Sequence, residues 1–109
     1  MSELTQKRCV PCEGGVPALQ KAEVEKFLSQ VPGWSLNGKW ITKEFKFKNF
    51  VEAMKFVNRV ADIAEAEGHH PDIHIHYNRV RFDIWTHAID GLSENDFILA
   101  AKIDDSKIP

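Results

Sequence analysis

The sequence lacks the features that several classes of protein require. No apolar run approaches the ~18 residues that a membrane-spanning helix needs. The opening residues MSELTQKRCVPCEGG have neither the apolar core nor the acid-poor composition of a targeting peptide. The formal net charge is −2, so no basic surplus is present to hold a nucleic-acid backbone. We therefore expect a soluble, cytoplasmic protein that binds neither membrane nor nucleic acid directly.

Cysteine is also scarce, with only Cys9 and Cys12, in a C-x-x-C spacing. Both lie in residues 1–17, which proline and glycine interrupt repeatedly, so we expect a flexible N-terminal arm there. A C-x-x-C pair can be half of a zinc site or a redox dithiol, but a four-ligand zinc site needs two further ligands and the chain has no third cysteine. We interpret the pair as two exposed thiols, with a metal shared across a symmetric dimer as the exception.

The remaining composition is that of an ordinary globular domain. The 109 residues are 43% hydrophobic and 28% charged, which is enough for a real core with little surplus. No internal repeat or low-complexity run divides the chain. The sequence therefore predicts one domain over residues 18–109.

Histidine is the concentrated residue, because all five histidines lie within the 19 positions from 69 to 87. Apolar and polar residues alternate on both sides of Asn78-Arg79, which predicts a two-stranded hairpin that turns at this pair. In that register the numbers of facing residues sum to 157. The predicted pairs are Tyr77 with Val80, Ile75 with Phe82, Ile73 with Ile84, His76 with Arg81, His74 with Asp83 and Asp72 with Trp85.

Beyond Pro71 the same register places His70 opposite His87, and His69 follows directly from the end of the preceding helix. Three imidazoles are thus expected at the open end of the hairpin. We expect His74 and His76, by contrast, to be strand-surface or interface residues, with nearer partners in Asp83 and Arg81.

The other elements follow from periodicity and from helix-boundary signals. Helices are predicted over about 19–31, from an Asn49 cap to about Glu67, and from Ser93-Glu-Asn-Asp96 to about Lys102. A first hairpin is predicted from Trp34 to Lys48, turning at Asn37-Gly38. Together these elements give an α+β fold, αββαββα, in which a four-stranded antiparallel sheet carries three helices on one face. The predicted buried helix residues are Phe50, Ala53, Met54, Val57, Ala61, Ala64, Phe97, Ile98 and Ala101.

Two kinds of chemistry suit clustered imidazoles. Two or three histidines with a carboxylate can bind catalytic zinc, but the adjacent His69 and His70 leave the chain in different directions, which disfavours one shared ion. General acid/base catalysis fits better, because an unperturbed imidazole pKa of about 6.5 allows proton donation and acceptance near neutrality. No serine or cysteine can be placed beside the cluster, so a nucleophile triad is unsupported.

The motif that carries these residues resembles that of the pterin-4a-carbinolamine dehydratases (4a-hydroxytetrahydrobiopterin dehydratases). The similarity spans about 19–103 and keeps its spacing throughout. Its residues are Gly33-Trp34, Glu65-x-x-x-His69-His70-Pro71, Tyr77, Thr86-His87 and Gly91-Leu92-Ser93-x-x-Asp96. The resemblance implies a homodimer or dimer of dimers with a pterin pocket built around the histidines. The implied reaction converts 4a-hydroxytetrahydrobiopterin into quinonoid dihydropterin and water, which supports tetrahydropterin recycling.

The resemblance also implies roles for single residues. His69 and His87 would carry the proton transfers, and which of them is the acid remains open. His70 would bind and orient the pterin, and Glu65 would support the site. Trp34 would shape the pocket, although core packing explains it equally well. Asp96 would be partly structural, because its capping position already accounts for it, and no metal or redox cofactor is implied.

Departures from the family pattern leave an alternative open. Gly68 stands where some members have an acidic residue, which could alter the tuning of the histidines. Some relatives with this fold are protein-binding factors, either dimerisation cofactors of a transcription factor or assembly factors for a carbon-fixing enzyme. The assembly factors often lose the histidines, and this chain keeps all three, which favours the enzyme. A protein partner bound through surface residues such as Lys55 and Arg59 is the alternative.

Overall fold

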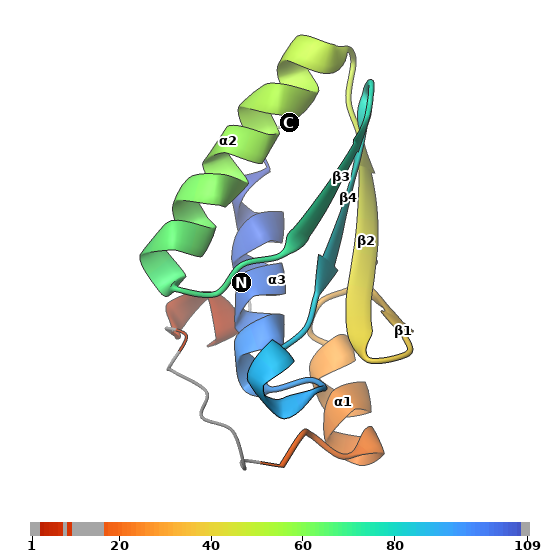
Figure 1. Ribbon diagram of the computed structural model, residues 1–109, viewed down its shortest axis with the longest axis vertical. Helices are drawn as coiled ribbons and strands as arrows, with labels where there is room; N and C mark the ends of the chain where they lie inside the picture. The colour runs from red at the N-terminus through yellow and green to blue at the C-terminus, as the bar shows by residue number, and fades with distance from the viewer. Residues whose placement is uncertain (1–2, 8, 10–16, 108–109) are drawn as a thin grey trace.

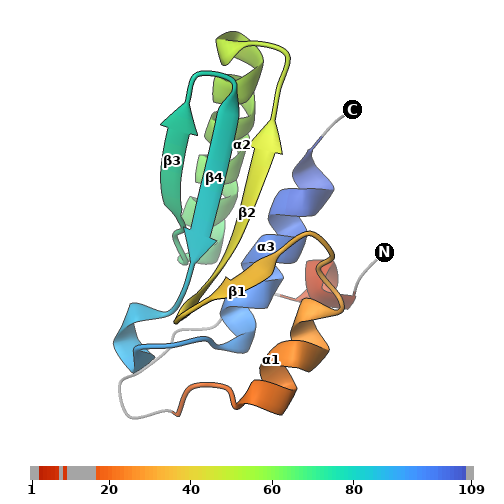
Figure 2. The same cartoon turned by 90° about the vertical axis from the view of Figure 1, so that its right-hand side faces the viewer.

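The structure, a computed structural model, describes residues 3–7, 9 and 17–107. Its elements are η1 (Glu3–Gln6), α1 (Lys21–Leu28), β1 (Ser35–Asn37), β2 (Trp40–Lys46), α2 (Phe50–Glu67), β3 (Asp72–His76), β4 (Arg79–Ile84), η2 (His87–Ile89) and α3 (Glu94–Ser106). The strands form one antiparallel sheet in the order β1-β2-β4-β3. The three α-helices lie on one side of this sheet, and Figure 2 looks onto the side that they leave uncovered (Figures 1 and 2). The predicted α+β fold is confirmed.

The helix boundaries are set by the predicted local signals. The Asn49 side chain accepts a hydrogen bond from the backbone N–H of Glu52 at 2.9 Å, which caps α2. Gly68 ends α2 in the left-handed region at φ 66°, a conformation that glycine adopts without a Cβ penalty. Ser93 and Asp96 form the predicted capping box at the start of α3. The last helix continues to Ser106, one turn past the predicted end.

The predicted register of the histidine hairpin is wrong by two residues. His76 pairs with Arg79, Ile75 with Val80 and His74 with Arg81, so the numbers of facing residues sum to 155. The turn is Tyr77-Asn78, because Tyr77 rather than Asn78 adopts a positive φ, of 54°. A shift by two keeps every side chain on its own face of the sheet. The apolar face was therefore predicted correctly although its pairs were not.

The first hairpin also turns one residue later than predicted. Asn37 pairs with Trp40, so the turn residues are Gly38 and Lys39, with Gly38 at φ 65°. The strong Asn-Gly signal located the hairpin but not its centre.

The buried stripe of α2 differs in part from the prediction. It is confirmed at Ala53, Val57 and Ala64. Phe50 and Ala61 are exposed instead, and Phe56 and Val60 are fully buried in their place. At 3.6 residues per turn, Phe50 and Ala61 fall at one edge of the stripe, whereas Val60 lies near its middle. The predicted burial of Phe97, Ile98 and Ala101 on α3 is correct.

The described part of the N-terminal arm is docked on the helices. Leu4 is 1% exposed, and η1 packs against α3. The backbone N–H of Cys9 donates to Glu67 at 2.8 Å, and Glu67 in turn pairs with Lys102 at 2.7 Å. Cys9 is partly buried against the core, so the prediction of an exposed thiol is wrong at this position. Burial, together with the nearby Glu67 carboxylate, raises the pKa of the Cys9 thiol to about 12. Cys12 lies outside the described residues.

Among the described residues, no helix combines the length and apolar character that crossing a bilayer demands.

Candidate active site

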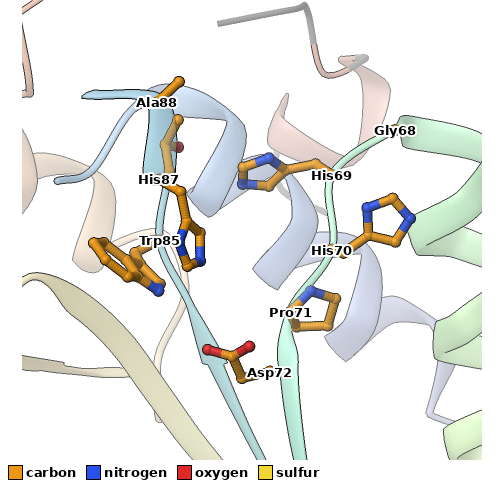
Figure 3. A pocket seen from close by; sticks show the side chains of 9 residues that line it. Gly68, His69, His70, Pro71, Asp72, Trp85, His87 and Ala88 are labelled. Carbon is orange, nitrogen blue, oxygen red and sulfur yellow. The ribbon is translucent and has the colours of Figure 1, made fainter. Parts of the chain in front are cut away.

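A pocket of about 380 Å³ opens where β3 begins and β4 ends. Its lining residues are Gly68, His69, His70, Pro71, Asp72, Trp85, Thr86, His87 and Ala88. Figure 3 shows His69 and His70 on the segment that leaves α2, and His87 across the pocket on the segment that follows β4. The three histidines thus lie at the open end of the hairpin as expected, although that expectation rested on a register that is wrong by two residues. The His70 ring points away from the other two, toward α2 (Figure 3).

His69 is held by a buried carboxylate. Its Nε2 lies 2.6 Å from Oδ1 of Asp96, and the Asp96 side chain is fully buried. The other carboxylate oxygen of Asp96 accepts from the Thr86 hydroxyl at 2.8 Å and from the Ser93 backbone N–H at 2.8 Å. A carboxylate only accepts hydrogen bonds, so Nε2 of His69 carries a proton, and in the neutral ring Nδ1 presents a lone pair.

Asp96 therefore does more than the sequence indicated. Its capping position was predicted, and its contact with His69, 27 residues away, was not. One sequence signal could have suggested this contact. An aspartate stands at the start of one helix, and a histidine directly follows the end of the long helix before it. Thr86, quoted only as part of a motif, is the second residue that sequence reasoning left without a role.

His70 has a different kind of partner. Its Nε2 lies 2.5 Å from Oε2 of Glu65, which is five residues earlier in the chain, on α2. Both side chains are largely exposed, at 58% and 77%. Exposed pairs of this kind are screened by water and contribute little to stability. The pair leaves the His70 ring adjustable at the pocket mouth.

His87 is not hydrogen-bonded to any carboxylate of the described residues, although Asp72 lines the same pocket (Figure 3). No hydrogen bond or ion pair joins its ring to another of the described residues; instead the ring lies against Trp85, with centroids 3.9 Å apart. The segment is fixed by an isolated bridge in which the Thr86 N–H donates to the Gly91 carbonyl at 2.8 Å. The backbone of His87 is thus held firmly, and its imidazole is held by an aromatic neighbour.

The remaining two histidines lie on the uncovered face of the sheet. Nε2 of His74 is 3.0 Å from Oδ2 of Asp83. Oδ1 of the same carboxylate accepts from the Thr42 hydroxyl and pairs with Arg81. His76 faces Arg79 across the hairpin. Within the described part of the chain, no three histidine, cysteine or acidic side chains are grouped so that they could hold a metal ion.

Comparison with known proteins places this geometry in a family. Residues 17–106 match the sequence model of the family described as pterin 4 alpha carbinolamine dehydratase. The chain belongs to this family.

Similar proteins of this dehydratase family match almost end to end. A relative from Halorhodospira halophila is 54% identical over 103 residues, which cover 93% of this chain and 94% of the relative. One from Rubrobacter xylanophilus is 50% identical over 105 residues, covering 95% and 98%. Both are provisionally named pterin-4-alpha-carbinolamine dehydratases.

Solved structures show the same fold. The transcriptional coactivator/pterin dehydratase from Brucella melitensis superposes with a TM-score of 0.77 at 36% identity, covering 81% of this chain and 96% of that one. A pterin dehydratase-like protein, described as a RuBisCO assembly factor in the alpha-carboxysome, has a TM-score of 0.59 at 24% identity, covering 67% and 87%. The second likeness shows the fold alone.

In this dehydratase-family chain, Trp34, Glu65 and Asp96 are predicted site residues that do not line the pocket. Asp96 and Glu65 contact the pocket histidines His69 and His70, and Trp34 contacts neither. The Trp34 ring is 5% exposed and packs near Phe45, and its Nε1 donates to Asp104 at 3.1 Å. This is the core-packing role that the sequence left open beside the pocket role. The tryptophan that lines the pocket is Trp85.

Proposed function

We propose that this chain dehydrates a 4a-hydroxytetrahydropterin, with 4a-hydroxytetrahydrobiopterin as the type substrate, to the quinonoid dihydropterin and water. The observation that carries the proposal is the pairing of two unlike imidazoles across one pocket. His69 is hydrogen-bonded to a buried carboxylate, and His87 is not. A pocket of about 380 Å³ also falls within the usual range for small-molecule sites, ~300–1,000 Å³.

The different surroundings of His69 and His87 give each histidine one of the two proton transfers. His69, with its Nε2–H directed at Asp96, offers the Nδ1 lone pair and takes the proton from N5 of the pterin. The electron pair left at N5 forms the double bond to C4a, and the bond from C4a to the hydroxyl oxygen breaks. His87 donates a proton to that departing oxygen, which leaves as water. The step balances with no oxidant, reductant or metal.

His70 and Glu65 act in binding rather than in proton transfer. His70 lines the pocket, and its exposed pair with Glu65 can contact polar edges of the pterin ring without a large desolvation cost. Asp96 orients His69 from behind and does not itself meet the substrate.

The test is stopped-flow absorbance of 4a-hydroxytetrahydropterin decay with metal-stripped protein. Wild type should accelerate the decay, and His69→Ala and His87→Ala should each lose about 10²-fold or more of that acceleration, the usual contribution of a general acid or base. His76→Ala is the matched control, because it removes the same ring from the uncovered strand surface. Near wild-type turnover in either pocket variant would refute the assigned roles.

The same experiment distinguishes the enzyme from the alternative, a protein-binding factor that uses the same fold. A folded wild-type protein that gives no acceleration would favour it. Partner capture should then survive both histidine substitutions and fail when surface residues of α2 such as Lys55 or Arg59 are changed. The homodimer or dimer of dimers implied by the family is tested separately by light scattering of the purified protein.

A further inference from the structure

Trp85 occupies a position in the pocket to which neither the motif nor the fold assigns a role. We propose that Trp85 is the positioning residue of His87: its indole holds the His87 imidazole in the orientation from which the ring donates its proton. This inference rests on the proposed dehydration.

The contact geometry supports this role. The Trp85 and His87 rings have centroids 3.9 Å apart and planes inclined at 43°, which is direct van der Waals contact. Trp85 is partly buried and lines the pocket together with His87. In Figure 3 the His87 ring stands with Trp85 on one side and His69 and His70 on the other. The indole therefore backs the imidazole on the side away from the other two histidines.

His87 needs such a support because, in the described part of the chain, its ring lacks the kind of hydrogen bond that holds each of the other two pocket histidines. His69 and His70 are each held at Nε2 by a carboxylate, whereas no hydrogen bond fixes the His87 ring among the described residues. An exposed side chain without a partner samples several rotamers, and ordering it when the substrate binds costs free energy. A rigid aromatic neighbour restricts those rotamers in advance.

Trp85 is itself supported from behind. Its ring lies 6.3 Å from that of Trp40, the first residue of β2. Trp40 belongs to the sheet, and its neighbour Ile41 pairs with Ile84 at the end of β4. The indole is thus wedged between the sheet and His87, and a rigid element rather than a mobile loop sets its position.

The contact can be tested without any activity. In nuclear magnetic resonance spectra, the carbon-bound ring protons of His87 should show an upfield ring-current shift, with the assignment made by their absence in His87→Ala. Trp85→Leu should remove the shift, and Trp85→Phe should keep most of it. His87 ring protons that do not move in Trp85→Leu would overturn the inference.

The catalytic consequence is tested by a double-mutant cycle. Misplacing a catalytic group by about 1 Å can cost up to ~10²-fold, so we expect Trp85→Leu to lower kcat about 10-fold with KM little changed, and Trp85→Phe to restore most of it. In the His87→Ala background, Trp85→Leu should cause no further loss. An equal further loss there, or an effect on KM alone, would overturn the inference. A wild-type protein that does not dehydrate the pterin would instead refute the proposed function, whatever the spectra show.

Discussion

Asp96→Asn is the substitution that separates the structural role of Asp96 from its role in orienting His69. The new side chain has nearly the same shape, and its amide oxygen can still accept from the Ser93 N–H and the Thr86 hydroxyl, as the carboxylate does at 2.8 Å to each. The amide NH₂ group must then face Nε2 of His69. Because NH₂ donates, Nε2 has to accept, and the ring proton moves to Nδ1, the atom that should receive the proton of the substrate.

The expected magnitudes follow from these bonds. The fold keeps three hydrogen bonds, but they are no longer made to a charged group, and the start of α3 loses a negative charge. Together these changes should lower the free energy of unfolding by about 1–2 kcal/mol. Catalysis loses its base in the correct tautomer, so kcat should fall by at least about 10²-fold. Asp96→Ala differs, because it leaves buried donors unsatisfied at about 1–3 kcal/mol each and should reduce stability much more.

The assay is stopped-flow turnover, measured in parallel with chemical denaturation. Asp104→Asn is the matched control, since Asp104 lies on the same helix and accepts from Trp34 at 3.1 Å and Lys43 at 2.8 Å, away from the pocket. We expect Asp104→Asn to cost stability and leave kcat unchanged. If Asp96→Asn keeps kcat within about 3-fold of wild type, His69 does not act as a base whose tautomer Asp96 sets.

Two further predictions concern the scaffold. A Cβ at Gly91 would lie 2.7 Å from the Cβ of Ala18, so Gly91→Ala should lower the free energy of unfolding by about 1–3 kcal/mol through overpacking. Thermal unfolding of the double variant should show that Ala18→Gly restores much of this loss. No recovery would mean that this clash is not the cause. With its pKa raised from 9.0 to about 12, Cys9 should react with iodoacetamide at pH 8 roughly 10³-fold more slowly than an ordinary thiol. Mass spectrometry of a Cys12→Ser protein, with the denatured protein as control, measures this rate, and equal folded and denatured rates would contradict the burial of Cys9.

Features set by neighbours in the sequence were predictable. Asn49 and Ser93 mark helix starts because their side chains bond backbone groups two or three residues away. The faces of the histidine hairpin were also predictable, since alternation fixes which side each residue occupies. Its register was not, because the position of the turn depended on a positive φ at Tyr77, a residue for which that conformation is uncommon.

Features that depend on packing between distant segments were only partly predictable. Two tryptophans, Trp34 and Trp85, flank apolar strands in similar ways, and local pattern does not say which of them lines the pocket. For Trp34 that choice depends on where β1 begins relative to α3, which is a property of the whole fold. The burial of Leu4 is a similar case, because a docking site formed by α3 is needed to bury it.

Asp96 shows how helix capping and site geometry can depend on the same hydrogen bonds. A helix start leaves backbone N–H groups without partners, and Asp96 accepts one of these, from Ser93, when α3 forms. Its carboxylate is therefore oriented by folding, before any substrate is present, and the Thr86 hydroxyl ties that carboxylate to the segment that carries His87. His69 meets a carboxylate whose position is already fixed, so ordering its ring costs little when the substrate binds. The exposed pair of Glu65 and His70 has no such connection to the core, which suits contact with a substrate and would not suit a proton transfer that needs fixed geometry.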